Sequence, residues 1–291
     1  MNKRDIIELL LKNGVMLTPE EAEKTDEKNY MQLLKKKLEG AEDDFVVIEP
    51  QKGRISSEEF VETHNKKFEF LRGLLLKKTD AVSINKGRKI FSEVTIIGRV
   101  KEQAARGFVL EDVTGETEVV SGKNHLMPGD VVGLKGHFKD NLFFSNQIIW
   151  PDVPLDGGAE PLGMSITLTT RVKEEMGGII ICPSARTAGN IIGGFGRLGT
   201  IKIRRRAKDL VVMAYSPSKE AGEEEAVMML KKRLVPEEGI PDNGITEVPG
   251  IFWLFRNGRN WTRNYRGILI VSTAQENFAE CHENEVLFGK I

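Results

Sequence analysis

The chain has 291 residues, of which 40% are hydrophobic and 29% are charged. This composition predicts a globular protein of roughly two domains and excludes a disordered chain. The 42 Lys and Arg residues nearly cancel the 43 Asp and Glu residues, so the chain as a whole exerts no strong attraction on nucleic acid or anionic lipid. Any such attraction must be local.

The sequence has no apolar run of about 20 residues that could span a bilayer. Its first residues carry acids within the apolar stretch, which is unlike a signal peptide. The two cysteines, Cys182 and Cys281, show neither the density of a disulfide scaffold nor a CxxC metal spacing. We therefore expect a cytoplasmic protein with no membrane partner.

Residues 1–45 are expected to form a small helical segment. Apolar residues recur at helical spacing in "KRDIIELLLKNG", and Gly14 is a C-terminal stop signal. Thr18 and Pro19 then fit the capping residue and the first position of a second helix. Such a segment docks on a partner or on the rest of the chain.

Residues 55–154 are expected to form a helix followed by a small barrel. In "SSEEFVETHNKKFEFLRGLLLKK", Phe60, Phe68, Leu71 and Leu75 fall at helical spacing. His64 on this helix has no second ligand nearby, which favours a structural histidine. Five short strands then follow, with glycines at the bends, and they suit a Greek-key barrel of the OB type.

Residues 160–291 follow a Gly/Pro-rich boundary, "PLDGGAEPLG". Apolar runs such as "GGIIICPS", "DLVVMAYS", "GIFWLF" and "RGILIVST" predict strands buried on both faces, with one helix in "KEAGEEEAVMMLKKRLVP". The fold class expected for the whole chain is therefore α+β and multi-domain. The last part would be a shortened α/β sandwich.

No catalytic or metal-binding group stands out in this last part. Strand ends are where α/β folds place active sites, and a two-metal hydrolase needs His, Asp and Asn ligands there. Residues 155–280 contain no histidine, and no nucleophile–base pair can be assembled. The loop Gly193–Gly196 could offer backbone N–H groups to a phosphate, but glycines that meet a backbone requirement are the simpler interpretation. We expect no catalytic residue, no metal and no cofactor.

Two basic runs remain as candidate binding surfaces. One is Arg197–Lys208, from which Lys202, Arg204, Arg205 and Arg206 are nucleic-acid candidates, with a plain solvated surface as the alternative for this run. In the other, arginines alternate with aromatic residues, a pattern found both in single-strand binding and at protein interfaces. A partner protein is favoured over nucleic acid for this second run. Its candidate contacts are Trp253, Arg256, Arg259, Trp261 and Tyr265.

Several phrases together resemble the small subunit of archaeal family-D DNA polymerases and, more broadly, the B-subunits of eukaryotic replicative polymerases. They are "HNKKFEFLRGLLLKK", "VTIIGRV", "LEDVTGE", "WPDVP", "ITEVPGIFW" and "YRGILIVST". The resemblance covers most of residues 55–280. It implies an OB barrel followed by a calcineurin-like phosphoesterase domain.

The metal ligands of that family are missing from this chain. Counting back from Tyr265-Arg266-Gly267, the family's Gly-His-x-His motif falls on Phe255, Arg256, Asn257 and Gly258. The family's Asp-x-His strand end corresponds to "SITLTTRV". Its Pro-Gly-Asn-His-Asp motif corresponds to residues 183–186, and its Tyr-His-Gly motif corresponds to "MAYSPS". The resemblance therefore implies a degenerate phosphoesterase domain that lacks a nuclease site.

The predicted function is that of a non-catalytic accessory subunit of a replicative or repair DNA polymerase. Its expected partner is the catalytic (large) subunit, with single-stranded or primer–template DNA as a second partner. The alternative is a free-standing OB-fold protein that binds single-stranded DNA. Phe143 and Phe144 are the candidates for base stacking, and one of this adjacent pair must point into the barrel.

Overall fold

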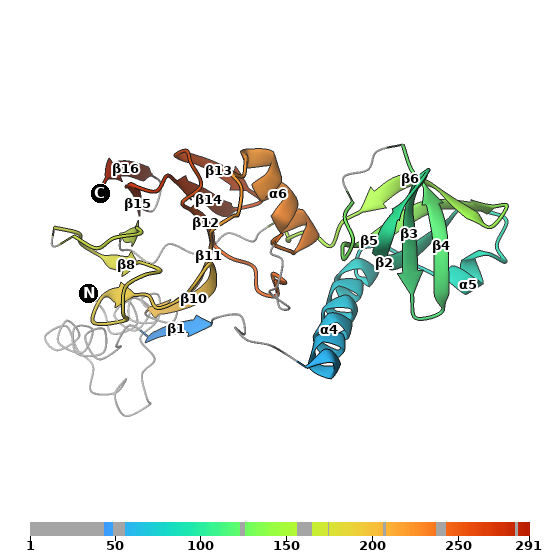
Figure 1. Ribbon diagram of the computed structural model, residues 1–291, viewed down its shortest axis with the longest axis horizontal. Coiled ribbons are helices and arrows are strands. Elements are labelled where there is room, and N and C mark those ends of the chain that lie inside the picture. Colours follow the sequence, from blue (N-terminus) through green and yellow to red (C-terminus); the bar gives the residue numbers. More distant parts are fainter. Residues whose placement is uncertain are drawn as a thin grey trace, which may run out of the picture. The chain divides into compact units, whose positions relative to one another are not determined.

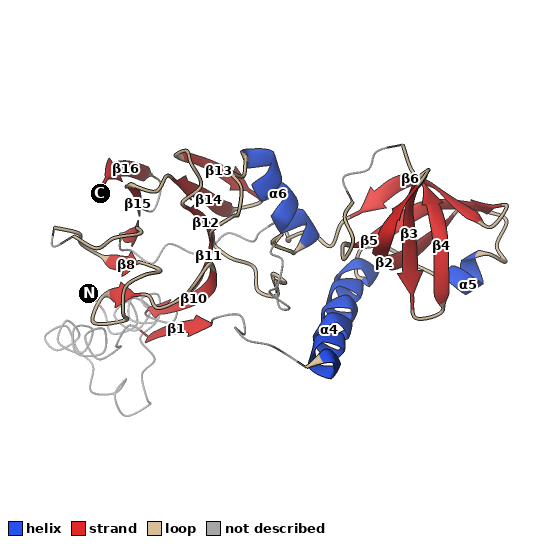
Figure 2. Cartoon of the chain, viewed as in Figure 1, coloured by secondary structure: helices blue, strands red, loops and turns tan. Residues whose placement is uncertain are grey.

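The computed structural model describes residues 44–48, 56–122, 126–155, 165–173, 175–205, 208–236, 243–282 and 285–291. They form a mixed α+β structure in which strands predominate (Figure 2). The chain divides into two compact units, each formed by segments distant in sequence. The first comprises 1–49, 158–216 and 249–291, and the second comprises 50–157 and 217–248. The expected N-terminal helical segment, residues 1–45, lies outside the described residues except for Asp44 and Phe45, which begin the strand β1 (Asp44–Ile48) and are not helical.

The second unit begins with the helix α4 (Ser57–Leu76), which was expected from its apolar spacing. Ser56 caps the helix by accepting a hydrogen bond from the Glu59 backbone N–H, while the Glu59 carboxylate accepts one from the Ser56 N–H. This capping box satisfies two of the donors that a helix start leaves unpaired. In the C-terminal half, Phe68, Leu71 and Leu75 are buried. They pack against Ile97 and Val131 of the barrel, together with Leu234.

The barrel that follows is closed and has five strands, in agreement with the prediction. Its strands are β2 (Val94–Ala104), β3 (Gly107–Asp112), β4 (Gly115–Val120), β5 (Val131–Lys139) and β6 (Leu142–Ile149), in the order β2-β3-β4-β6-β5 (Figure 1). Neighbouring strands are antiparallel except β4 and β6. The alternating inward residues, among them Phe108, Leu110, Leu134 and Phe143, fill the interior.

Two shorter helices complete the second unit. The single turn α5 (Ile84–Gly87) lies beside the β3–β4 turn, where the Ile84 N–H donates to the Asp112 carboxylate. Helix α6 (Glu223–Lys232) is tied to the barrel by Lys232 Nζ, which lies 2.6 Å from Asp130 Oδ2. The same ammonium lies 5.8 Å from the centre of the Trp150 ring. Glu223, Glu224 and Glu225 at the start of α6 are exposed.

The first unit contains two sheets. One has six strands in the order β1-β10-β11-β12-β14-β13. Its strands are β1 (Asp44–Ile48), β10 (Leu198–Arg205), β11 (Lys208–Tyr215), β12 (Ile251–Phe255), β13 (Trp261–Tyr265) and β14 (Ile268–Thr273). The neighbours β11, β12 and β14 are parallel, and the other pairs are antiparallel.

The other sheet has five strands in the order β16-β15-β7-β8-β9. They are β7 (Ile166–Leu168), β8 (Ile179–Ile181), β9 (Ile191–Ile192), β15 (Asn277–Cys281) and β16 (Val286–Lys290). The apolar runs predicted strands only as far as "RGILIVST", so β15 and β16, which follow it, were not predicted.

A single apolar core lies between these two sheets. Its residues come from both, including Leu168 and Ile181 from the five-stranded sheet and Val212, Trp253 and Val271 from the six-stranded sheet. The unit is therefore a two-sheet sandwich. Across the described residues of both units, no helix is both long enough and apolar enough to cross a membrane.

Candidate functional site

The strand ends of the first unit gather at one edge of the sandwich. The parallel strands β7, β8 and β9 all end there. Thr273 at the end of β14 connects through Ala274–Glu276 to the start of β15, which pairs with the end of β7 through Ala279 and Leu168. The parallel strands β11 and β12 end beside β14. We call the described residues 169–173, 182–187, 193–197, 256–260 and 274–276 the strand-end edge.

Hydrogen bonds connect the loops of the strand-end edge to one another. Thr170 Oγ1 donates to the Gln275 carbonyl over 2.9 Å, and Ser184 Oγ donates to the Thr170 carbonyl over 2.9 Å. On the other sheet, the Ala274 N–H donates to Asn260 Oδ1 over 2.9 Å. The loops after β7, β8, β12 and β14 therefore hold each other in place.

The loop after β12 is fixed by a buried polar network. Asn257 is 1% exposed, and its Nδ2 donates to Ser272 Oγ over 3.0 Å. Ser272 Oγ in turn donates to the Arg259 carbonyl over 2.6 Å. Arg256 has φ 58 and Gly258 has φ 80, so the chain turns sharply here. In this turn Asn257 points inward while Arg256 is exposed.

Trp253 was a candidate partner contact, and the structure contradicts that role. Its side chain is fully buried in the core of the sandwich, beside the Phe255 ring at 5.1 Å between centroids. Its indole N–H donates to Thr273 Oγ1 over 2.9 Å. All five residues of β12 are buried, so alternation along the strand gives no exposed position. Trp253 stabilises the sandwich and offers no contact surface.

The other partner candidates lie at or near the edge strand β13. Arg256 and Arg259 are exposed in the preceding loop, while Trp261 and Tyr265 are half-buried in the strand itself. Trp261 pairs with Ser272 and Tyr265 pairs with Ile268. Both aromatic side chains therefore belong to the sheet face opposite the sandwich core, because the core-facing residue of β14 is Val271.

The strand-end edge carries several exposed arginines. Arg171 follows β7, Arg186 follows β8 and Arg256 follows β12, and all three are exposed. Arg197 precedes β10 and donates from Nη2 to the Ser216 carbonyl over 3.1 Å. Within the parts of the chain that the structure describes, no ion pair involves Arg171, Arg186 or Arg256.

Metal-binding residues are not grouped at this edge. Among the residues with a described position, no three His, Cys, Asp or Glu side chains lie close enough together to hold an ion. The two thiols are both buried. Cys182 Sγ lies 3.6 Å from Ser184 Oγ. Burial raises the pKa of the Cys281 thiol to about 12, and the neighbouring Glu280 carboxylate adds to this effect.

The glycine loop at this edge has a structural explanation. A Cβ on Gly193 would collide with the backbone oxygens of Cys182 and Ala185. The Gly193 N–H already donates to Thr187 Oγ1 over 3.1 Å. This glycine allows a close approach of two backbone segments, as the simpler interpretation of the sequence proposed.

The first basic run extends from the strand-end edge to the opposite end of the sandwich. Lys202 is half-buried in β10, and Arg204 is exposed. Arg204 forms two hydrogen bonds with the Asp209 carboxylate, of 2.8 and 3.0 Å, and these lower the pKa of Asp209. The Arg205 backbone pairs with Lys208 across the hairpin. Arg206 lies outside the described residues.

The two aromatic candidates of the barrel point in opposite directions. Phe143 is fully buried in the barrel core and cannot stack with a base. Phe144 is half-buried on the outside and stacks on the exposed His137, with ring centroids 5.6 Å apart and planes at 13°. Only Phe144 of this pair is placed where a base could reach.

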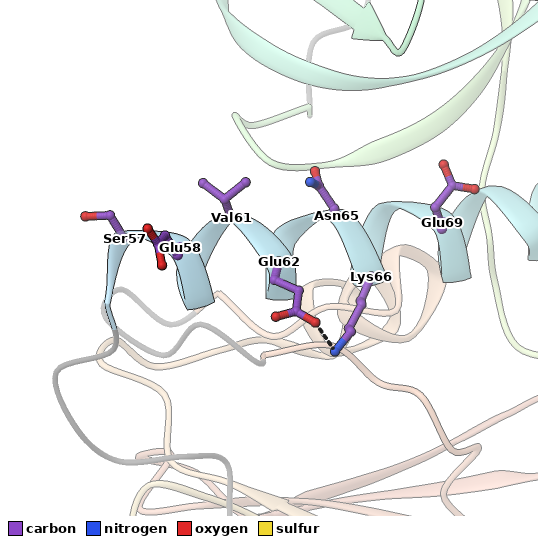
Figure 3. A pocket seen from close by; sticks show the side chains of 7 residues that line it. All are labelled: Ser57, Glu58, Val61, Glu62, Asn65, Lys66 and Glu69. Carbon is purple, nitrogen blue, oxygen red and sulfur yellow. Dashed lines mark ion pairs between the residues drawn. The ribbon is translucent and has the colours of Figure 1, made fainter.

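A hollow of about 710 Å³ lies along the N-terminal half of α4 (Figure 3). Its described lining comes from one helix, and the side chains include Ser57, Val61, Glu62, Asn65 and Lys66. Glu62 and Lys66 form an ion pair of 2.7 Å. This exposed helix surface brings together no catalytic combination. His64, on the same helix, is half-buried.

Comparisons with known proteins include a curated relative and a solved structure. No family model matches the chain. The solved structure, the hypothetical protein ygiW from E. coli, is 18% identical and covers 24% of this chain and 89% of its own. Its TM-score of 0.22 is too low to support a fold argument.

The curated relative is the DNA polymerase II small subunit of Archaeoglobus fulgidus. It is 32% identical over 113 residues, which cover 35% of this chain but only 23% of the relative. Over about a third of its length, this chain is therefore similar to the small subunit of an archaeal DNA polymerase.

Proposed function

We propose that the chain is a non-catalytic accessory subunit of a replicative or repair DNA polymerase. The observation that carries this proposal is the 32% identity to a DNA polymerase small subunit. A small subunit acts in association with a catalytic chain, so the proposed partner is the large polymerase subunit. The same similarity favours this function over a free-standing protein that binds single-stranded DNA.

The residue types at the strand-end edge support a non-catalytic role. A metal-dependent hydrolase needs imidazole and carboxylate ligands that converge on the ions. The described loops after β7, β8 and β12 present Arg171, Arg186, Arg256 and the internally bonded Asn257. Such side chains bind anions or hold the fold together, and guanidinium groups repel a cation. A sensitive test is nuclease activity of the purified chain with Mn²⁺, for which we expect none.

The fold assignments that accompany this function are also proposals. The strand order β2-β3-β4-β6-β5 of the closed barrel supports the OB type. The two-sheet sandwich, with six strands ending at one edge, supports a degenerate phosphoesterase-like domain. An experimental structure of the chain bound to the large polymerase subunit would test both assignments, because its barrel and its sandwich could each be superposed on the domains of an active small subunit.

The proposed docking residues are Arg256, Arg259, Trp261 and Tyr265, at the end of β12 and along the edge strand β13. Arginine and half-buried aromatic side chains are the residue types that dominate binding energy at protein interfaces. We expect the double variant Arg256→Glu/Arg259→Glu to reduce recovery of the large subunit at least tenfold in a nuclease-treated pull-down. A matched control is Arg106→Glu/Lys139→Glu, which reverses two exposed charges on the barrel. Equal recovery with both variants would remove the docking site from the proposal.

A further inference from the structure

The strand-end edge combines three features that suit a phosphate-binding surface. It is basic, its loops are fixed, and its arginines are exposed. The residues of the strand-end edge, 169–173, 182–187, 193–197, 256–260 and 274–276, carry six cations against one carboxylate, Glu276. The cations are Arg171, Lys173, Arg186, Arg197, Arg256 and Arg259. The chain as a whole is almost neutral, so this excess is local.

Arg171 and Arg186 extend from neighbouring loops that are held together. Their strands β7 and β8 are adjacent and parallel, with Leu168 paired to Ile181. The Ser184–Thr170 hydrogen bond then joins the two loops beyond the strand ends. Thr169 Oγ1 accepts from the Arg171 N–H over 3.2 Å and fixes the first turn after β7. Both arginines therefore extend from a rigid base, which lowers the entropy lost when they bind.

Arg256 reaches the same edge from the facing sheet. Its backbone adopts the left-handed conformation at φ 58, which non-glycine residues rarely adopt. The Asn257–Ser272–Arg259 network holds this turn in place. A strained position at a strand end, with its charged side chain exposed, is typical of functional loops.

The guanidinium groups of Arg171, Arg186 and Arg256 are not neutralised by a carboxylate within the described residues. The hairpin at the opposite end differs, because Asp209 neutralises Arg204 there. An arginine presents a planar fork of donors that matches two phosphate oxygens. A row of such groups over a non-catalytic surface suits a strand of linked phosphates without base specificity.

We propose that the strand-end edge binds the phosphate backbone of DNA through Arg171, Arg186 and Arg256. The choice of DNA among polyanions rests on the proposed polymerase function; the position of the surface rests on the geometry. This surface lies away from the 202–206 candidates, and it assigns the DNA contact of the first unit to the loops after β7, β8 and β12.

The test is fluorescence anisotropy of a labelled 30-nucleotide dT strand and of a duplex of equal length, titrated with the full chain between 50 and 200 mM salt. We expect Arg171→Gln/Arg186→Gln to weaken binding about tenfold or more at low salt. Each lost phosphate contact should reduce the slope of log affinity against log salt by about 0.7–0.9. The DNA form that binds with the higher affinity is the preferred ligand.

The matched control is Lys202→Gln/Arg204→Gln, at and near the opposite hairpin, which removes the same charge. We expect its affinity to stay within about twofold of the parent chain. The proposal is overturned if the parent chain binds neither DNA form. It is also overturned if the control loses as much affinity as the edge variant, or if a few millimolar phosphate displaces the DNA at constant ionic strength, which would indicate a site for free phosphate.

These variants leave the proposed polymerase function separately testable. Neither Arg171 nor Arg186 belongs to the proposed docking residues, so recovery of the large subunit should be unchanged in the edge variant. A chain that captures the large subunit without binding DNA would contradict only the DNA surface. A chain that binds DNA at this edge without capturing a polymerase would contradict only the accessory role.

Discussion

Asn257 and Ser272 are joined by a 3.0 Å hydrogen bond in the interior of the strand-end edge. Ser272 stands near the end of β14, and its hydroxyl donates a hydrogen bond to the Arg259 carbonyl. The loop that carries Arg256 and Arg259 is therefore fixed by a neutral amide and a hydroxyl. Both proposed surfaces, for the partner and for DNA, depend on this loop.

Replacing Asn257 by Ala should destabilise the first unit by about 1–3 kcal/mol, because the substitution leaves buried polar groups without their partner. Urea unfolding followed by tryptophan fluorescence measures this, since Trp253 lies in the same core. Thr262→Ala, at an exposed position of β13, should change stability by less than about 0.5 kcal/mol. Equal effects of the two substitutions would show that the network does not fix the loop.

The Asp130–Lys232 ion pair should be a strong determinant of how α6 attaches to the barrel. Both side chains are largely buried, at 7% and 14% exposure, and Asp130 Oδ2 also accepts from the Met127 N–H. Asp130→Ala removes this carboxylate from beside the buried Lys232 charge, which costs about 3–5 kcal/mol. Thermal unfolding of the single variants and of Asp130→Ala/Lys232→Met measures the coupling. We expect the double variant to be more stable than Asp130→Ala alone.

Two glycines should respond in opposite directions to the same substitution. Gly136 in β5 faces the Phe144 backbone oxygen so closely that a Cβ cannot fit, so Gly136→Ala should destabilise the barrel by at least 1–3 kcal/mol. Gly73 in α4 has open space around it. Gly73→Ala should therefore stabilise the chain by about 0.5–1 kcal/mol, because glycine is unfavourable in a helix. Differential scanning calorimetry of both variants measures these changes in stability. A stabilised Gly136→Ala variant would contradict the register of β5 and β6.

Cys281 should make stability depend on pH in the alkaline range. Its pKa is about 12 in the folded chain, against about 8.5 for an unfolded thiol. The folded state therefore holds the proton more tightly. The stabilisation of the folded state that this pKa difference gives is fully present below about pH 8.5 and declines as pH rises towards 12. Cys281→Ala should show a smaller loss of stability between pH 8 and 10.5 than the parent chain, as measured by urea midpoints.

The same burial should protect the Cys281 thiol from alkylation. Only the thiolate reacts, and at pH 8 the folded chain holds Cys281 as the neutral thiol. Iodoacetamide labelling read by mass spectrometry should modify Cys281 only after unfolding. Rapid labelling in the native state would show that β15 is not buried against the sandwich core as described.

Much of the fold follows from the sequence because its strands and helices have clear local signals. The apolar spacing of α4 and the five short strands of the barrel were predicted, and the apolar runs gave β8, β11, β12 and β14. Trp253 was misplaced because a strand buried on both faces shows no alternation. The edge strands β13 and β16 were missed because sheet-edge strands tolerate polar residues. The interior strand β15 was missed because its sequence, "NFAEC", contains no apolar run.

The strand-end edge could be predicted only in part. The absence of histidine from residues 155–280 was visible in the sequence, and Arg256 was identified as a candidate. Arg171 and Arg186 were not, because each is an isolated arginine in a different loop. Their proximity depends on the parallel pairing of β7 with β8, and Arg256 joins them only because the β14–β15 turn connects the two sheets. Such long-range pairing leaves no local pattern.

The most direct test of the accessory role is affinity purification of the tagged chain from native, nuclease-treated lysate, with quantitative mass spectrometry of the bound proteins. The account predicts recovery of a large DNA polymerase subunit in near-equal amount, with the recovery lost in Arg256→Glu/Arg259→Glu. Recovery of the chain alone, or of proteins that disappear on nuclease treatment, would contradict it.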